Sequence, residues 1–191
     1  MTRDPAEHDV NELAPLETAV VIVVNALELQ RIYRDSYPAF AELGIPLHVT
    51  LLYPFTTPGE LGSALPLLRK VLADQEQFAF ELMELRTFPR TVWLAPEPAA
   101  PFVALTRAIE AAFPQYQHWE GKFEDVIPHL TLADGLEENE LEPTLRRLRT
   151  LVEPLLPVRV AADKATVLAE QQSGHWVAAA QLPLSARAED I

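Results

Sequence analysis

The sequence predicts a mixed α and β protein built from two similar halves that share one core. Its 191 residues suit one compact domain or two small lobes, and 49% of them are hydrophobic, enough for a substantial core. The expected order of elements is strand, helix, short strand, helix, strand, and this order occurs twice along the chain. The two halves therefore form an imperfect internal duplication.

Hydrophobic periodicity supplies the elements of the first half. Short β-branched runs predict strands, and apolar residues spaced three and four apart predict helices. The first half then contains strands at 18–25, 48–52 and 78–87, and helices at 27–37 and from 57 to about 74. Thr57 and Glu60 have the spacing of a capping box, with Pro58 at the first helical position. Pro66 predicts that this helix is kinked or begins late.

The second half repeats this order and ends in a hairpin. Its expected elements are a strand from 91–94, a helix between Pro101 and Pro114, a strand at 129–133, a helix opened by Pro143, and two long β segments at 158–170 and 175–182. Acidic residues precede Pro143 and arginines follow it, an order that suits the helix dipole. We expect residues 17–184 to form a single domain, with solvated tails at 1–16 and 185–191.

Charge and composition exclude several classes of function. Fifteen basic residues against 28 acidic ones give a net charge of −13, which disfavours duplex DNA, long RNA and anionic membranes. The longest apolar run, 19–24, is far shorter than the roughly 20 residues of a membrane span. We expect no secretory signal, and the absence of cysteine excludes disulfides and thiolate sites. We expect a cytoplasmic monomer acting on a small molecule or short oligomer.

The two short strands carry the same motif, in which a histidine and a threonine flank one apolar residue and a leucine follows. The motifs are His48-Val49-Thr50-Leu51 and His129-Leu130-Thr131-Leu132. Because residues i and i+2 of a strand point to the same face, each histidine projects with its threonine while the apolar neighbours enter the core. If the halves pack with pseudo-twofold symmetry, two imidazoles and two hydroxyls converge on one cleft.

Such a set of side chains suits phosphodiester chemistry. With an ordinary pKa of about 6.5, one neutral histidine can take a proton from the nucleophile and one protonated histidine can give a proton to the leaving oxygen. Threonine hydroxyls can donate hydrogen bonds to the non-bridging phosphoryl oxygens. The scheme requires neither a metal nor another cofactor.

Other interpretations of the two motifs remain open at this point. The histidines can be packed or loop-capping residues of the structure. A two-histidine metal site is another alternative, although the motifs contain no carboxylate and Asp134 follows only one of them. A non-catalytic nucleotide-binding or sensor module could also retain the same cleft.

The motif segments 47–55 and 128–132 resemble the paired motifs of the 2H phosphoesterase superfamily, also described as 2′-5′ RNA ligase-like or LigT-like proteins. The resemblance implies a bilobal, pseudo-twofold α+β fold with two antiparallel sheets facing a central cleft and helices outside. It also implies a phosphoesterase that cleaves or forms phosphodiesters at the ribose 2′ position of small nucleotides or short RNA. The catalytic residues it implies are His48, Thr50, His129 and Thr131.

Four further residues are candidates for binding substrate. Tyr53 and Phe55 follow the first motif and can stack on a nucleobase, although Phe55 suits a core position equally well. Arg90, in the turn between two β segments, is a candidate for a second phosphate, although most turn arginines are solvated. Phe123 lies in the irregular stretch before the second motif, where a loop can cover the cleft.

Overall fold

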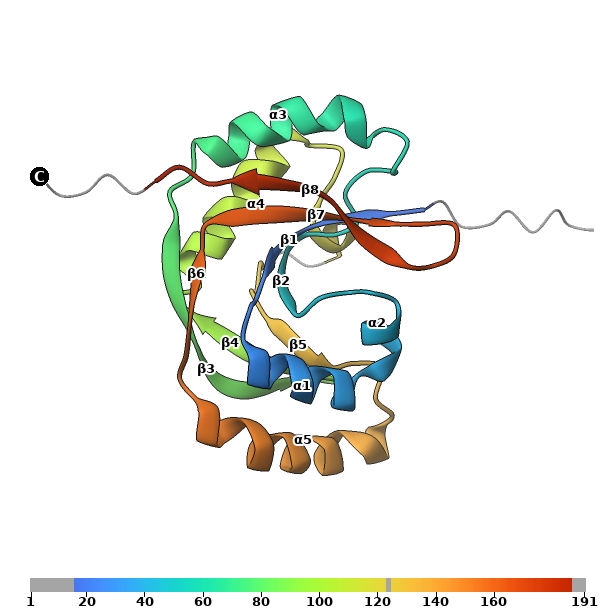
Figure 1. Ribbon diagram of the computed structural model, residues 1–191, viewed down its shortest axis with the longest axis vertical. Helices are drawn as coiled ribbons and strands as arrows, with labels where there is room; N and C mark the ends of the chain where they lie inside the picture. Colours follow the sequence, from blue (N-terminus) through green and yellow to red (C-terminus); the bar gives the residue numbers. More distant parts are fainter. Residues whose placement is uncertain (1–15, 123–124, 187–191) are drawn as a thin grey trace, which may run out of the picture.

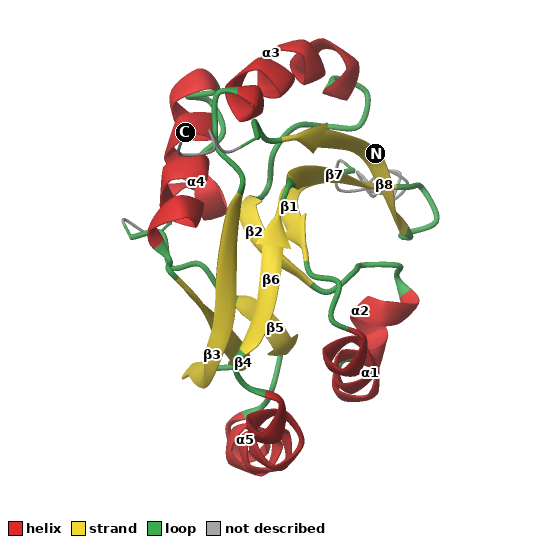
Figure 2. Cartoon of the chain, turned by 60° about the vertical axis from the view of Figure 1, so that its left-hand side comes forward, coloured by secondary structure: helices red, strands yellow, loops and turns green. Residues whose placement is uncertain are grey.

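The computed structural model describes residues 16–122 and 125–186. Eight strands form one sheet, and helices lie at its two ends (Figures 1 and 2). The strands are β1 (Thr18–Val23), β2 (His48–Leu52), β3 (Phe78–Phe88), β4 (Thr91–Glu97), β5 (Leu130–Ala133), β6 (Val158–Ala162), β7 (Lys164–Glu170) and β8 (Trp176–Pro183). The helices are α1 (Leu27–Ser36), α2 (Pro38–Glu42), α3 (Leu61–Ala73), α4 (Ala100–Ala112) and α5 (Glu138–Val152), with short 3-10 turns η1 (His118–Gly121) and η2 (Glu153–Leu155).

The two motif strands lie side by side at the centre of the sheet. The strand order is β6-β3-β4-β5-β2-β1-β7-β8, and every neighbouring pair is antiparallel. The α+β class is therefore confirmed, and the two sheets that we expected are joined through β2 and β5 into one curled sheet (Figure 1). One half of the sheet is β6-β3-β4-β5 and the other is β2-β1-β7-β8, so each half of the sheet combines strands from both halves of the sequence.

The four longer helices divide into two pairs, and each pair packs on one part of the sheet. Helices α3 and α4 pack on each other and on β8 and β2, whereas α1 and α5 pack on β5 and β4 (Figure 1). The main hydrophobic core lies between these helices and the sheet. A smaller apolar cluster of Ala19, Val21 and Leu168 lies on the other face. Within the described residues, none of the helices combines the length and hydrophobicity needed to cross a membrane.

Helix α3 begins later than its capping-box spacing predicts. The side chains of Thr57 and Glu60 bond to each other at 2.9 Å, so they do not cap the helix. The carbonyl of Thr57 accepts hydrogen bonds from the backbone N–H groups of Glu60 and Leu61, and the chain forms a turn before Leu61. Helix α3 thus begins at Leu61, and Pro66 still lies inside it, so the helix does not start at this proline.

Two prolines have roles at helix boundaries that the sequence pattern does not predict. Pro38 directly follows the helix expected at 27–37, and it begins the short helix α2, since proline is well tolerated at the first helical position. Helix α5 begins at Glu138, five residues before Pro143, because Glu137 and Glu140 form a reciprocal capping box. Side-chain acceptors thus set the start of α5 more strongly than the proline does.

The long β segment expected at 158–170 is two strands that belong to different halves of the sheet. Strand β6 pairs with β3, and β7 pairs with β1 and β8, so the chain crosses between the halves at Asp163. Ser185, expected in the tail, is bonded to the backbone of Gln75 and Gln77. The remainder of both expected tails, apart from residues 16 and 186, lies outside the described residues.

Candidate active site

Strand β2 separates its polar and apolar side chains onto two faces. His48 and Thr50 are half-buried, whereas Val49 between them is completely buried in the main core. Strand β5 and the residue before it repeat this arrangement, with His129 and Thr131 half-buried. The structure therefore places each histidine on the same face as its threonine, as the spacing predicts.

The join between β2 and β5 brings the two motifs together. Val49 and Leu130 are direct partners in this antiparallel pair. Because the pair is antiparallel, His48 lies opposite Thr131 and Thr50 lies opposite His129. The histidine of each motif therefore lies beside the threonine of the other motif. Directly opposite side chains have Cβ atoms roughly 4.5–5.5 Å apart in antiparallel sheets. We call the face that carries these motif side chains the motif face.

Both imidazole rings are held by the same backbone contact. Nδ1 of His48 lies 2.7 Å from the carbonyl oxygen of Pro46, and Nδ1 of His129 lies 2.7 Å from that of Ile127. A carbonyl only accepts hydrogen bonds, so Nδ1 carries the hydrogen in each ring. Nε2 is then the nitrogen that gains or loses a proton. The spacing of the motifs does not predict that these carbonyls contact the histidines.

Burial and neighbouring charges act on the two histidines differently. Burial lowers the pKa of His48, the Pro46 carbonyl opposes this shift, and the positive charge of His129 lowers the pKa further. Burial also lowers the pKa of His129, but the Ile127 carbonyl and the Asp134 carboxylate oppose it. Of the two rings, only His129 has a carboxylate among the groups that shift its pKa.

Aromatic rings contact His129 on the second half of the motif face, the part that carries the second motif. Its ring meets Phe88 edge-on at 5.2 Å and Trp93 at 5.8 Å between centroids, and these two aromatic rings stack on each other at 4.8 Å. The Arg86 guanidinium lies 5.8 Å from the Trp93 ring. Trp93 is also the cross-strand partner of Thr131. These rings fix the orientation of His129 and limit its contact with water.

A second group of aromatic rings lies on the first half of the motif face. Tyr53 is half-buried and meets Trp119 edge-on at 5.4 Å and Trp176 at 6.4 Å. Its hydroxyl is hydrogen bonded to the carboxylate of Glu17, and its carbonyl accepts the Trp119 N–H at 2.7 Å. Tyr53 packs against the Val21 cluster, which places it on the motif face.

Trp119 is held in an unusual left-handed turn. Trp119 and Glu120 have φ values of 48° and 56°, and Gly121 has 70°. Consecutive left-handed residues are rare because each costs roughly 1–2 kcal/mol unless it is glycine. The preceding His118 anchors the turn, since its Nδ1 and its backbone N–H lie 2.6 and 3.0 Å from the buried Glu110 carboxylate. The sequence carries no clear signal for this anchor.

Comparison with known proteins identifies the family of this chain. Residues 5–174 match the model of the 2′-5′ RNA ligase superfamily. The chain belongs to this superfamily. A protein of Oceanobacillus iheyensis, provisionally named a phosphoesterase, is 30% identical over 114 residues. That match covers 55% of this chain and 62% of the relative, less than two thirds of its length.

Solved structures share the fold of this superfamily member at low sequence identity. The E. coli LigT crystal structure without ligand aligns with a TM-score of 0.60 and 18% identity, covering 90% of this chain and 98% of LigT. A second crystal structure, described as a phosphoesterase, gives 0.60 and 16%, covering 90% and 99%. LigT in complex with 3′-AMP gives 0.56 and 15%, covering 89% and 98%.

Two of the expected binding residues have structural roles. The prediction that Phe55 stacks on substrate is wrong, because it is only 2% exposed and packs on Phe113 and Tyr116 in the core. The Arg90 guanidinium donates hydrogen bonds to the carbonyls of Gly135 and Leu136, so it holds the loop between β5 and α5.

Arg90 also pairs with Glu137 at 3.2 Å, at the N-terminus of α5. Each of its described partners therefore belongs to that loop or to the helix cap, and the expected phosphate contact stays a prediction. The expected role of Phe123 falls outside the described residues.

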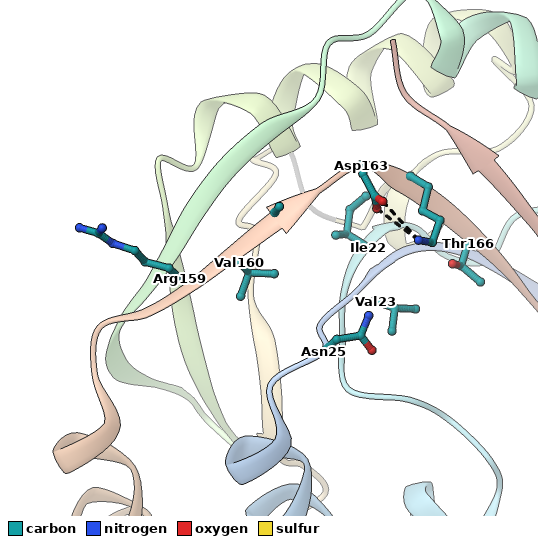
Figure 3. Close-up of a pocket in the computed structure, with 9 residues that line it drawn as sticks. Ile22, Val23, Asn25, Arg159, Val160, Asp163 and Thr166 are labelled. Atoms are coloured by element: carbon teal, nitrogen blue, oxygen red, sulfur yellow. Dashed lines mark hydrogen bonds and ion pairs between the residues drawn. The ribbon is translucent and has the colours of Figure 1, made fainter. Parts of the chain in front are cut away.

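A pocket of about 180 Å³ lies beside the motif face, between β1, β6 and β7 (Figure 3). Its lining residues are Ile22, Val23, Asn25, Arg159, Val160, Ala161, Asp163, Lys164 and Thr166. The motif histidines and threonines do not line it, but Val23 is the cross-strand partner of His48. The pocket thus adjoins the motif face, and the chemistry is assigned to the paired motifs rather than to the pocket.

The metal-site alternative lacks further ligands in the part of the chain that the structure describes. No group of three or more histidine, aspartate or glutamate side chains there is arranged to hold a metal ion. The motif face instead presents two imidazoles and two hydroxyls, a set suited to proton transfer beside a phosphoryl group.

Proposed function

We propose that this protein is a metal-independent phosphodiesterase that acts at the ribose 2′ position of small nucleotides or short RNA. Its substrates are 2′,3′-cyclic phosphates or short 2′,5′-linked oligonucleotides. The observation that carries this proposal is the pair of imidazoles at one strand join, each with Nδ1 held by a carbonyl and Nε2 left for proton transfer. Membership of the superfamily supports the same chemistry.

In the proposed reaction the two histidines move one proton each. A hydroxyl nucleophile, water in hydrolysis or a ribose hydroxyl in ligation, attacks phosphorus and gives its proton to Nε2 of a neutral histidine. The bond from phosphorus to the leaving ribose oxygen breaks, and the protonated histidine supplies the proton to that oxygen. Exchange with solvent then restores the starting protonation of both rings.

Thr50 and Thr131 hold the phosphoryl group during this displacement. Each hydroxyl lies beside the histidine of the other motif, so a phosphoryl group between the imidazoles is within reach of both. Hydrogen bonds to its non-bridging oxygens keep the attacking and leaving oxygens in line and stabilise the charge of the transition state.

The surroundings of the site favour a small nucleotide substrate. Tyr53 and Trp119 offer aromatic surface on which a base can stack, and the net charge of −13 disfavours long RNA. LigT, which has the same fold, forms crystalline complexes with 3′-AMP, ATP and NADP+. We assign the activity to one domain over 17–184, acting as a cytoplasmic monomer.

The substrate assignment is tested with the four nucleoside 2′,3′-cyclic monophosphates and a 2′,5′-linked diadenylate, in excess EDTA. Phosphorus NMR follows the products, and the position of the remaining phosphate shows which ester bond breaks. We expect turnover of at least one substrate at a rate that EDTA does not change. Loss of activity in EDTA would contradict the mechanism. Tight binding of every substrate without turnover would indicate a sensor instead.

A further inference from the structure

The strand that carries the second motif contains a β-bulge that redirects its next polar side chain. The pairing of β4 with β5 shifts register between Val92 and Trp93. As a result, the consecutive residues Leu132 and Ala133 are both buried in the main core. The residue after them, Asp134, therefore returns to the motif face. Bulges commonly re-aim a side chain in this way beside active sites.

A hydrogen bond from β4 fixes Asp134 on this face. The hydroxyl of Thr91 donates a short hydrogen bond to the Asp134 carboxylate. Thr91 lies two residues before Trp93 on β4, so both side chains point to the same face. Since the Trp93 ring contacts His129, the Asp134 carboxylate is held on the same side of the sheet as this histidine.

The first motif has the same bulge without a carboxylate at this position. The pairing of β1 with β2 shifts register between Val20 and Val21, and Leu51 and Leu52 are both buried. The residue that returns to the motif face is Tyr53. The two halves of the site thus match in their histidines, threonines, carbonyl contacts and bulges, and differ at Tyr53 and Asp134.

Other charged or titratable groups near His129 do not duplicate this effect. From β3, the Arg86 guanidinium approaches the Trp93 ring and is paired with the carboxylate of Glu84. From β2, His48 contributes the second imidazole. From the end of α1, Tyr37 responds to the same carboxylate, since burial first and Asp134 second raise its pKa.

On the first half of the motif face, burial and three carboxylates raise the pKa of Tyr53: Glu17, which is bonded to its hydroxyl, and then Glu170 and Glu120. The pKa of His48 is shifted by burial, by the Pro46 carbonyl and by His129, and not by these carboxylates. The electrostatic contrast between the two histidines therefore arises mainly from Asp134 on the second half.

We propose that Asp134 is a positioning residue that gives the two motif histidines different roles. The carboxylate favours the protonated form of His129, which then donates its Nε2 proton to the leaving oxygen. His48 stays neutral beside the charged His129 and takes the proton of the attacking nucleophile on its own Nε2. This inference rests on the proposed phosphodiesterase function and specifies which histidine is the acid and which is the base.

The pH dependence of kcat/KM tests this assignment in the variant Asp134→Asn. Asparagine keeps an oxygen for Thr91 but removes the charge. With His129 as the acid, the alkaline limb of the bell-shaped profile reports its titration, and we expect that limb to move roughly half a pH unit or more toward lower pH. The matched control Glu137→Gln removes one charge from the same loop and should leave both limbs in place. An unchanged alkaline limb, or a shift of the acidic limb instead, would overturn the proposal.

NMR titration of the histidine Cε1–H signals tests the same inference without turnover. In Asp134→Asn the pKa of His129 should fall, while the pKa of His48 should stay constant or rise slightly. The assignment of each signal comes from the His48→Gln and His129→Gln variants. If the protein hydrolyses no phosphodiester but these shifts occur, the proposed function fails and the electrostatic role of Asp134 stands. Equal titration of His129 in wild type and variant would reject that role.

Discussion

The chemistry of each motif histidine depends on a backbone carbonyl two residues earlier in the chain. The carbonyls of Pro46 and Ile127 hold Nδ1–H, which fixes both the tautomer and the direction of the ring. Without that contact an imidazole on a strand could present either nitrogen to a substrate. Equivalent contacts in both halves therefore prepare two Nε2 atoms for proton transfer.

Replacing either motif threonine with valine should impair catalysis without unfolding the protein. Thr50→Val or Thr131→Val keeps the β-branched shape and removes the hydroxyl that stabilises the phosphoryl oxygens. We expect kcat to fall roughly 10²-fold, the scale of losing one transition-state donor, with KM changing less. Steady-state kinetics on a 2′,3′-cyclic monophosphate measure this, with thermal unfolding as the control. A variant with the wild-type kcat would show that its hydroxyl does not contact the transition state.

The lowered pKa values of His48 and His129 also predict how stability depends on pH. Their folded-state pKa values lie below the ordinary value of 6.5, so the unfolded chain binds more protons in the window between the two. Stability is therefore complete above about pH 6.5 and is lost as the pH falls through that window. The double variant His48→Gln/His129→Gln should lose less stability between pH 7.5 and 5 than wild type does. Urea unfolding at both pH values measures this; an equal loss in both proteins would contradict it.

At the scale of elements, the relative position of the two motifs depends on a short join between strands. The pair Val49 and Leu130 is the register contact between β2 and β5. Helix α4 supports β2 from the core side, because the Thr106 hydroxyl donates a hydrogen bond of 2.8 Å to the Leu51 carbonyl. Packing at this join therefore controls the distance between the two imidazoles.

A cavity at the join should affect catalysis more than an equal cavity elsewhere. Val49→Ala and Val167→Ala both remove a completely buried valine side chain, and each should destabilise the fold by roughly 1–3 kcal/mol. Only Val49→Ala should also lower kcat at temperatures where both variants are folded, because only it loosens the β2–β5 pair. Equal kcat values in the two variants would show that the join does not set the catalytic geometry.

Local sequence patterns predict the elements of this fold better than their pairing. The alternation of His48-Val49-Thr50 places the strand and its polar face correctly, since both depend on neighbouring residues. The start of α5 and the break at Asp163 were not predicted, because they depend on a side-chain cap and on pairing with distant strands. The bulge that exposes Asp134 on the motif face arises in the same way, from register with β4.

In the candidate site, too, local sequence patterns predict some residues, and others depend on packing between distant segments. Its histidines and threonines follow from a repeated spacing, which is a local property of the chain. The burial of Phe55 does not, because Phe55 and Tyr53 are both aromatic and both follow the first motif. Only the packing of Phe55 against Phe113 and Tyr116 separates the core residue from the one on the motif face.

At the scale of the whole molecule, the net charge of −13 opposes the approach of an anionic substrate. Among the described residues, the positive charge that we place on the motif face is that of the histidines and of Arg86, which is paired with Glu84. Selectivity therefore depends on contacts within the site rather than on long-range attraction.

This charge balance predicts an unusual response to salt. Screening weakens repulsion between the protein and a 2′,3′-cyclic monophosphate, so kcat/KM should rise roughly 1.5- to 3-fold between about 10 and 200 mM NaCl. Proteins that bind nucleic acid through many phosphate contacts show the opposite dependence. Initial rates at constant pH measure the effect, and a steep fall with salt would reveal a cationic binding surface that the charge balance does not predict.

The most direct test of the whole account is the turnover of one 2′,3′-cyclic monophosphate, measured side by side for wild type, His48→Gln and His129→Gln. Glutamine approximates the size and polarity of histidine but cannot exchange a proton near neutral pH. The account predicts that each variant melts close to the wild-type temperature and that each loses roughly 10²- to 10⁴-fold in kcat. A folded variant of either histidine that keeps the wild-type rate would contradict the two-histidine mechanism.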